Sequence, residues 1–424
     1  MRKMKDSGIE WIGEIPNDWR VYKVKNICRI RGEKNRPQAQ VLSVYRELGV
    51  VVKAERNDNH NVTSEDTSSY KYVLPNDLVV NKMKAWQGSM GISRFEGIVS
   101  PAYYVFKIIS DEIYPMYIHY LLRNVAYLPE YRRLSGGIRP GQWDLSIENL
   151  QNIPILIPPY DNQCRIVSYL ERKCSQIDDI IARQQEVIEK LKAYKLSVIT
   201  EAVTKGLNPD ARMKDSGVEW IGEIPEHWSI VPLTKQLESI VDYRGKTPEK
   251  VDDGIFLVTA RNIKNGMIDY SISSEYVKAE DYDEIMRRGI PQIGDVLFTT
   301  EAPLGQVANV DRTDIALAQR IIKFSTKKHL DSYFLKYWIM SIGFQNFLMT
   351  LSTGSTAVGI KASKLFMLPV PLAPMQEQNQ IVTYLDKKCK MIESVIDRKQ
   401  ALVDKFTDYK KSLIYEVVTG KKEV

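Results

Sequence analysis

Two stretches of the chain carry apolar residues at every third or fourth position and contain neither proline nor glycine. They are residues 166–204 and 381–419. This spacing places the apolar side chains on one face of an α-helix. The sequence therefore predicts two helices of about 38 residues, each about 57 Å long at about 1.5 Å per residue. The positions expected to form the seam, the line along which the two helices pack, are Leu170, Ile177, Ile181, Ile188 and Leu191 in the first helix, and Leu385, Ile392, Ile396, Val403 and Phe406 in the second.

Polar residues interrupt the two seams at matching places. Gln184 and Lys399 occupy one such position, and Lys195 and Lys410 occupy another. A polar seam residue usually reflects local exposure to solvent. Recurrence at the same register also allows pairing between the helices, with the polar positions setting the register. Both interpretations remain open on the sequence alone.

Outside the helices the pattern changes to short apolar runs broken by Gly, Pro, Asn and Asp. Residues 20–150 and 229–365 are of this kind, with runs such as 103–108 and 319–324. This is typical of mixed α+β domains with many turns. We expect the prolines before each helix to end any strand there and to fix the start of the helix. These prolines are Pro154, Pro158 and Pro159 before the first helix, and Pro369, Pro371 and Pro374 before the second.

The chain repeats itself. Residues 4–19 and 213–228 are identical at thirteen of sixteen positions, and the helix beginning at Ile166 matches the helix beginning at Ile381. The protein therefore consists of two halves, about 4–212 and 213–424, whose middle segments have diverged. One scaffold with two different working surfaces is the simplest interpretation.

The fold class predicted is α+β, with two pseudo-symmetric mixed α/β domains separated by two long antiparallel helices that form a coiled coil. The expected limits are 1–155 for the first globular domain, 156–205 for the first helical segment, 206–370 for the second globular domain and 371–424 for the second helical segment. Such a body fits a long, repeating partner. Duplex DNA, at about 34 Å per turn, and a protein filament both qualify.

Composition and charge narrow the class of protein. The chain has 424 residues, of which 44% are apolar and 26% charged, which excludes wholesale disorder. We expect neither a membrane span nor a secretory signal, and the four cysteines, without a CxxC pair, fit a reduced cytoplasm. The net charge of +6 is uneven: residues 1–150 carry 22 basic and 17 acidic groups, and residues 206–370 carry 19 and 21. The second domain can therefore bind a polyanion only if its basic side chains gather on one face.

A search for catalytic motifs finds none. Ile157-Pro-Pro-Tyr160 resembles the (Asn/Asp)-Pro-Pro-(Tyr/Phe) motif of amino-methyltransferases, but isoleucine cannot accept a hydrogen bond from the target amine. The segment from Gly354 to Lys361 lacks the Gly-Lys-Ser/Thr ending of a phosphate loop. The four histidines have no metal-ligand spacing. We expect no catalytic residue, no metal site and no bound cofactor in this chain.

The divergent middles contain side chains suited to nucleic acid. Glycine loops let the backbone approach phosphate, arginine can pair with guanine, and glutamine can pair with adenine. The candidates in the first domain are Arg36, Lys82, Lys84, Trp86, Gln87, Ser89, Arg139, Gln142 and Trp143. Those in the second are Arg244, Lys246, Thr247, Arg261, Asn262, Thr300, Gln319, Arg320, Ser355, Thr356 and Lys361. Any one of them could instead belong to a solvated loop.

These features together resemble the specificity subunit of type I restriction–modification systems. The resemblance rests on the duplicated halves, the DSGxEWIGEIPxxW opener, the Ile-Val-x-Tyr-Leu helix start and Asn81-Lys-Met-Lys-Ala-Trp-Gln-Gly88. It implies two target-recognition domains, each reading one half of a bipartite asymmetric DNA site, and a coiled coil that spaces them. The turn from Lys82 and the loops around Gly137 and Gly354 match the family's recognition segments.

The resemblance also implies partners and a location. These are double-stranded DNA, two modification subunits that bind S-adenosylmethionine, and restriction subunits that use ATP and Mg²⁺, in the cytoplasm of a bacterium or archaeon. Adenine methylation and DNA cleavage would then take place in the partner subunits. Two other functions remain as alternatives: a two-armed protein scaffold, which would show no salt-dependent DNA binding, and a stand-alone DNA methyltransferase, which would bind S-adenosylmethionine by itself.

Overall fold

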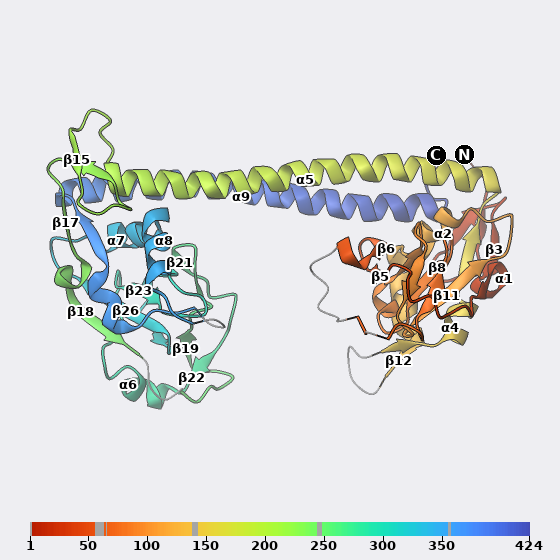
Figure 1. Ribbon diagram of the computed structural model, residues 1–424, viewed down its shortest axis with the longest axis horizontal. Coiled ribbons are helices and arrows are strands. Elements are labelled where there is room, and N and C mark those ends of the chain that lie inside the picture. The colour runs from red at the N-terminus through yellow and green to blue at the C-terminus, as the bar shows by residue number, and fades with distance from the viewer. Residues whose placement is uncertain (1, 56–62, 65, 138–142, 244–247, 355–357) are drawn as a thin grey trace. The chain divides into compact units, whose positions relative to one another are not determined.

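The computed structural model describes residues 2–55, 63–64, 66–137, 143–243, 248–354 and 358–424. The chain forms two compact units (Figure 1). Unit 1 comprises Met1–Gln185 and Ala401–Val424, and unit 2 comprises Glu186–Gln400. Each unit therefore contains one globular domain together with a part of both long helices. The mixed α+β class is confirmed.

Helices α5 (Tyr160–Lys205, 46 residues) and α9 (Met375–Val418, 44 residues) are longer than the sequence predicts. Both begin directly after a proline: the amide of Asn162 donates to the Pro159 carbonyl at 2.9 Å, and the amide of Gln378 donates to the Pro374 carbonyl at 3.0 Å. The first turns carry few apolar residues, so the apolar periodicity detects the helices only from Ile166 and Ile381 onward.

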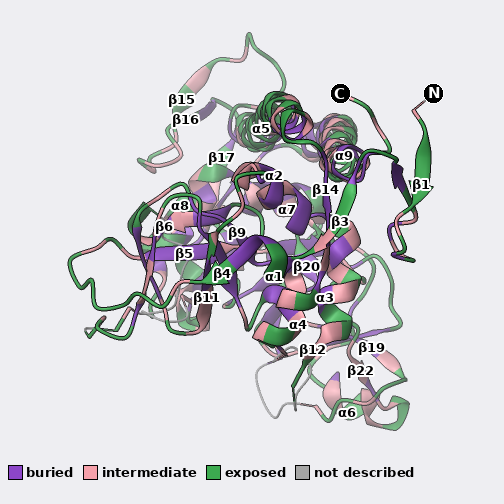
Figure 2. Ribbon diagram, turned by 90° about the vertical axis from the view of Figure 1, so that its right-hand side faces the viewer, coloured by how far each residue is buried: buried purple, intermediate pink, exposed green. Residues whose placement is uncertain are grey.

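Within each unit, a segment of α5 packs against a segment of α9, and the two segments run in opposite directions. In unit 1 the start of α5 and the end of α9 share one apolar core, and in unit 2 the end of α5 and the start of α9 share another. The ten predicted seam residues are all buried or half-buried. The outer faces of both helices are exposed (Figure 2).

The two seam lysines form equivalent ion pairs. Lys195 pairs with Glu393 in unit 2, and Lys410 pairs with Asp178 at 2.6 Å in unit 1. In the repeat, Asp178 corresponds to Glu393 just as Lys195 corresponds to Lys410, so both units contain the same contact. Of the two interpretations that the sequence allows for these lysines, pairing between the helices is therefore the correct one.

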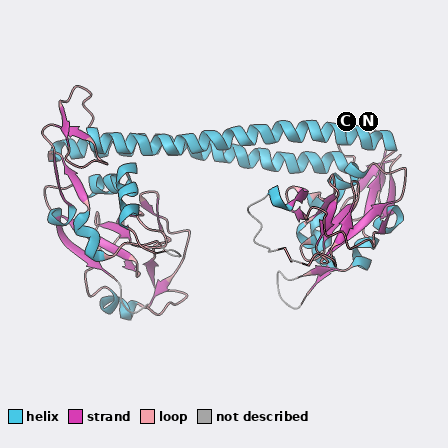
Figure 3. Cartoon of the chain, viewed as in Figure 1, coloured by secondary structure: helices cyan, strands magenta, loops and turns pink. Residues whose placement is uncertain are grey.

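Both globular domains are built on a four-stranded antiparallel sheet with the same strand order, β4-β11-β8-β9 in unit 1 and β18-β26-β23-β24 in unit 2. Each domain combines strands with short helices (Figure 3). The registers are equivalent, because Phe106 lies opposite Leu78 and Phe324 lies opposite Val296. Around this common sheet the units differ. Unit 2 adds the three-stranded sheet β22-β19-β25, whereas unit 1 has the hairpin β5-β6 and the pair β10-β7.

The elements have the following limits. The strands of unit 1 are β1 Met4–Asp6, β2 Glu14–Pro16, β3 Arg20–Lys23, β4 Cys28–Ile30, β5 Leu42–Tyr45, β6 Gly49–Val52, β7 Lys71–Val73, β8 Leu78–Asn81, β9 Met90–Ile92, β10 Gly97–Val99, β11 Tyr103–Ile108, β12 Ser135–Gly136, β13 Asp144–Leu145 and β14 Pro154–Ile157. Its shorter helices are α1 Val24–Ile27, α2 Pro115–Leu122, α3 Leu128–Leu134 and α4 Ile147–Asn152. The strands of unit 2 are β15 Met213–Asp215, β16 Glu223–Pro225, β17 Ser229–Pro232, β18 Leu237–Asp242, β19 Ile255–Val258, β20 Ile263–Lys264, β21 Met267–Ile268, β22 Tyr276–Val277, β23 Val296–Thr299, β24 Val307–Asn309, β25 Ile315–Leu317, β26 Ile321–Thr326 and β27 Pro369–Leu372. Its shorter helices are α6 Tyr282–Ile285, α7 Ser332–Met340 and α8 Ile342–Leu351.

The repeated opening motif forms a β-hairpin in each unit, β1-β2 and β15-β16. Its tryptophan packs on the globular domain. Trp11 meets the ring of Tyr127 at 4.8 Å, and Trp220 stacks on Phe347 at 4.9 Å and on Trp338 at 5.7 Å. The motif that identifies the repeat is thus a structural cover over each domain.

The expectation that the prolines would end any strand before the helices is wrong. Pro154 begins β14, which pairs with β3, while Pro369 and Pro371 lie in β27, which pairs with β17. Both sheets have only two strands, so every strand is an edge strand. A proline that lacks a donor is tolerated there because one side of the strand needs no partner.

A buried glutamine joins each helix to its globular domain. In unit 2, Gln378 is fully buried and its amide donates to the carbonyls of His329 and Ala373 at 2.9 and 2.8 Å, while its oxygen accepts from the amide of Asp331 at 2.8 Å. Gln163 makes the equivalent three contacts in unit 1, with Glu112 and Tyr114 just before α2 and with the carbonyl of Pro158 just before α5. The first turn of each long helix is thereby fixed to the loop that precedes α2 or α7.

Each sheet also holds a buried carboxylate at the same place, neutralised in two different ways. Asp77 pairs with Arg31, at the end of β4, with 2.6 Å between Nε and Oδ2. Asp295 pairs with Lys323, in β26, with 2.8 Å between Nζ and Oδ2. Both carboxylates are less than a tenth exposed. Both sheets therefore keep a buried aspartate at this position, but the basic residue that pairs with it lies at a different strand in each unit.

Candidate nucleic-acid interface

In unit 1, the segment from Lys82 to Gly88 forms a tight turn around a 3₁₀ helix at Ala85–Gln87. Gly88 ends this helix in the left-handed region, at φ +86°, and a Cβ added there would lie 2.9 Å from the Leu128 side chain. Both observations require glycine. The turn presents Trp86, whose ring meets that of Trp143 edge to face at 5.3 Å.

Strand β13 docks onto this turn. The amide of Leu145 donates to the Lys82 carbonyl at 3.1 Å, and the Lys82 ammonium lies 3.1 Å from the Asp144 carboxylate. Hydrogen bonding to Asp144 raises the pKa of Lys82. The sequence identifies the turn and the loop as separate candidates, and the structure brings the turn together with Trp143, the described residue at the end of that loop.

A lysine cluster that sequence reasoning missed adjoins the same surface. It consists of Lys34, Lys71 and Lys82. Burial lowers the pKa of Lys71, and repulsion from the ammonium groups of Lys34 and Lys82 lowers it further. The Lys71 ammonium donates to the Tyr103 carbonyl at 2.5 Å and lies 5.6 Å from the centre of the Tyr104 ring. The isolated β-bridge between Lys34 and Lys71 could not be foreseen, because 36 residues of varied sequence separate the two. A cluster of like charges of this kind favours an anion.

Unit 2 repeats the construction with different side chains. The amide of Ile360 donates to the Thr300 carbonyl at 3.0 Å, which is the counterpart of the contact between Leu145 and Lys82. Gly359 allows this docking, since a Cβ added there would lie 3.1 Å from both the Thr300 carbonyl and the Glu301 Cβ. Arg320 completes the surface, with its Nε 2.9 Å from Glu301 Oε1. The charged and polar side chains at this place are therefore Lys82 and Asp144 in unit 1. In unit 2 they are Thr300, Glu301 and Arg320.

The other predicted contact residues fall into three groups. Arg36, Lys84, Arg261 and Lys361 are exposed, and Gln87 and Gln319 are half-buried. Ser89, Asn262 and Thr300 are buried. Arg139, Gln142, Arg244, Lys246, Thr247, Ser355 and Thr356 lie outside the described residues.

Asn262 is the residue whose environment fits a DNA contact least. It is fully buried, its amide donates to the carbonyls of Asp269 and Ser273 at 3.0 Å, and its oxygen accepts from Thr259. All its polar atoms have partners within the domain, so it stabilises the chain around β20 rather than presenting a group to a ligand.

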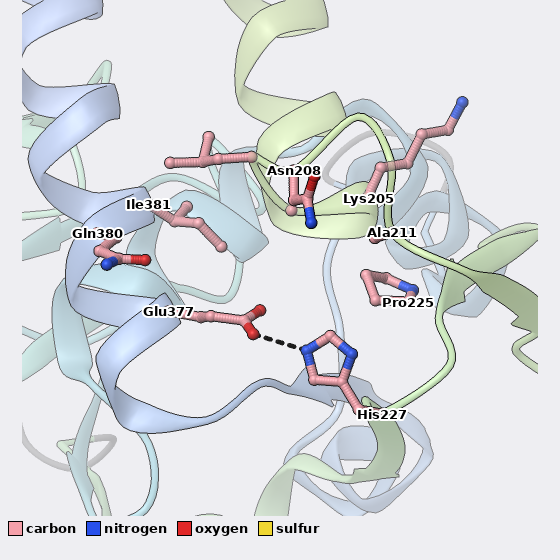
Figure 4. A pocket seen from close by; sticks show the side chains of 10 residues that line it. Lys205, Asn208, Ala211, Pro225, His227, Glu377, Gln380 and Ile381 are labelled. Carbon is pink, nitrogen blue, oxygen red and sulfur yellow. Dashed lines mark hydrogen bonds and ion pairs between the residues drawn. The ribbon is translucent and has the colours of Figure 1, made fainter.

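A pocket of about 170 Å³ lies in unit 2 where the chain leaves α5 (Figure 4). His227 Nε2 lies 2.6 Å from Glu377 Oε1, and the Trp228 indole donates to the other carboxylate oxygen at 2.8 Å. Glu377 is thus engaged on both oxygens and anchors the start of α9 to the two residues that precede β17. The described residues include no group of three His, Cys, Asp or Glu side chains placed to hold a metal ion. None of the described helices is long and apolar enough to cross a membrane.

Comparisons with known proteins agree with this architecture. Residues 16–190 and 232–402 match the family described as type I restriction modification DNA specificity domain. The chain is 24% identical over 400 residues to the MjaVIII type I restriction enzyme specificity subunit of Methanocaldococcus jannaschii, covering 89% of this chain and 88% of that protein. It is 22% identical over 411 residues to the EcoKI specificity subunit of Escherichia coli K12, covering 88% and 83%.

Among solved structures, the fold is similar to a chain from a structure describing complex assembly and conformational transition of the type I restriction–modification system. The TM-score is 0.70 at 14% identity, with 96% of this chain and 99% of that chain covered. The two chains therefore share a fold. Because the two matched segments together span more than half of the sequence, this chain belongs to the type I restriction modification DNA specificity domain family.

Proposed function

We propose that this chain is the DNA-recognition subunit of a type I restriction–modification complex and that each unit reads one half of a bipartite site. The single observation that carries the proposal is the matched construction of the two surfaces. In each unit a backbone amide, that of Leu145 or of Ile360, donates to the carbonyl of the residue that follows the same strand of the same sheet, β8 or β23. The side chains differ, so the two half-sites are unlike.

The chemistry of each surface suits duplex DNA. In unit 1, Lys34, Lys71 and Lys82 supply positive charge for phosphate. Trp86 and Trp143 form an edge-to-face aromatic pair next to Lys82. In unit 2, Arg320 provides a guanidinium that can reach base edges. Phosphate contacts hold the duplex in place and base contacts select the sequence.

Partner subunits would bind the exposed faces of the long helices. In unit 2, Val187 and Tyr194 are exposed on α5, seven residues apart, and in unit 1 the equivalent Leu402 and Tyr409 are exposed on α9. Apolar residues at heptad spacing favour a further helix. Two such faces, one in each unit, would accommodate two modification subunits.

On this proposal the chain is not itself an enzyme. Methyl transfer from S-adenosylmethionine to adenine takes place in the modification subunits, and ATP-dependent cleavage takes place in the restriction subunits. The chain positions both on the DNA, in the cytoplasm of a bacterial or archaeal cell. A target adenine in each half-site is turned out of the helix into the partner's active site.

The test is to sequence adenine methylation in a host that carries this gene and in the same host without it. Loss of one bipartite methylated motif on deletion is the expected result. If no motif is lost, and if the purified chain with its modification subunits shows no salt-dependent DNA binding, the chain is a protein scaffold instead. If the chain alone binds S-adenosylmethionine and transfers methyl groups, it is a methyltransferase.

A further inference from the structure

Arg320 has a backbone conformation that arginine rarely adopts. Its φ is +73°, in the left-handed region where a Cβ is unfavourable. The Thr300 turn holds it there, because the Arg320 carbonyl accepts from the Thr300 amide at 2.9 Å and from the Thr300 hydroxyl at 3.2 Å. Strain of this kind persists where the surrounding structure imposes it, commonly at binding sites.

The side chain of Arg320 is exposed and yet oriented. Half of it is accessible to solvent, and its Nε lies 2.9 Å from Glu301 Oε1. Glu301 is itself tied to the glycine loop through a β-bridge to Gly359. Within the part of the chain that the structure describes, the two terminal nitrogens of the guanidinium have no partner.

This arrangement suits a base pair better than a phosphate. A carboxylate beside the guanidinium weakens its attraction for a phosphate and repels the phosphate directly. At a G·C pair both groups find complements: the guanidinium donates to guanine O6 and N7, and a carboxylate accepts from the cytosine N4 amino group.

Unit 1 has no counterpart. The strand registers place Tyr103 opposite Asn81 and Ile321 opposite Thr299, so the residue before β11, Ala102, corresponds to Arg320. Alanine offers no hydrogen bond. A contact made by Arg320 therefore belongs to one half-site alone.

We propose that Arg320, positioned by Glu301, reads the guanine of one G·C pair in the half-site bound by unit 2. This inference rests on the proposed function. It adds a base identity, the residue that selects it and the half of the site in which it lies.

The experiment compares methylation motifs and binding for wild type, Arg320→Gln, Arg320→Lys and the control Arg312→Gln. Each variant is expressed in the host with the modification subunit of the same system. Arg312 is a matched control, because it is a partly exposed arginine of unit 2 that is also paired with an acid, Asp314. Arg320→Gln should relax one G·C position in one half-site, with about a 10- to 100-fold loss of discrimination there. The other half-site and the control should not change.

Arg320→Lys separates base readout from charge. Lysine keeps the positive charge but loses the forked donor, so a base reader should lose discrimination and a phosphate contact should be preserved. The proposal is overturned if Arg320→Lys keeps the wild-type motif and discrimination, or if Arg320→Gln weakens binding to all sequences equally. Absence of any bipartite motif with the wild-type chain would instead contradict the proposed function.

Discussion

Replacing Gln378 by glutamate tests whether the buried glutamine fixes α9 to its globular domain. The substitution Gln378→Glu preserves shape and the acceptor for the Asp331 amide, but it removes the two donors that face the carbonyls of His329 and Ala373. Two lost hydrogen bonds cost about 1 kcal/mol each, and leaving their buried acceptors unpaired costs about 1–3 kcal/mol more. We therefore expect unit 2 to lose about 3–5 kcal/mol of stability at neutral pH.

The loss should depend on pH with a definite sign. A buried carboxyl among carbonyls has a pKa in the folded state above its unfolded value of about 4.3. Below that value both states are protonated and the charge adds no cost. Above it the unfolded state loses its proton first, so the variant loses about 1.4 kcal/mol per pH unit until the folded pKa is passed.

Urea unfolding, monitored by hydrogen exchange and mass spectrometry, measures the change in the free energy of unfolding and shows whether it lies in unit 2. Gln380→Glu is the control, because it makes the same chemical change at an exposed position two residues further along the helix. It should change the free energy of unfolding by less than about 0.5 kcal/mol. If the two variants unfold alike at pH 8, the reasoning about the buried glutamine is refuted.

Three further predictions concern stability, binding and spacing. Burial lowers the pKa of His119 to about 3 in the folded state, so the free energy of unfolding of unit 1 should fall by about 2 kcal/mol between pH 7 and pH 5, because the histidine takes up a proton in the unfolded state. His119→Gln should make the free energy of unfolding, measured in urea, less dependent on pH over this range. Lys71→Gln should reduce the slope of log affinity against log salt by about 0.9 in DNA titrations of the assembled complex, whereas Lys107→Gln, at an exposed lysine of β11 in the same unit, should reduce it less; equal slopes would exclude Lys71 as a phosphate contact. Deleting 178–184 together with 393–399 should change the spacing between the methylated half-sites or abolish assembly, and an unchanged motif would contradict the assignment of the helices as spacers.

The sequence predicts the repeat and the helices well, because both depend on local pattern. It underestimates the length of the helices, since the turn after Pro159 is polar and hydrogen bonding, not apolar periodicity, begins the helix there. Gln163 and Gln378 escape notice as polar residues near the start of a helix, although their alignment in the two repeats was a usable signal. Lys71 and Asn262 show the limit more clearly. Whether a polar side chain faces solvent or the core depends on strand pairings between distant segments, which no local pattern specifies.

The buried carboxylates of the two sheets restrict how the halves of this gene can recombine. A crossover between β8 and β11 could join the N-terminal part of unit 1, through β8, to the part of unit 2 that begins at β26. In this hybrid Asp77 would have both Arg31 and Lys323 as partners. The reverse crossover would leave Asp295 with neither cation, an unpaired buried charge that costs about 3–5 kcal/mol. Crossovers in the repeated ends, 4–19 with 213–228 or the two helix starts, carry each carboxylate together with its own cation. New pairs of half-sites can therefore arise by exchange of whole domains, whereas exchange of single strands destabilises the domain by leaving a buried carboxylate without its cation.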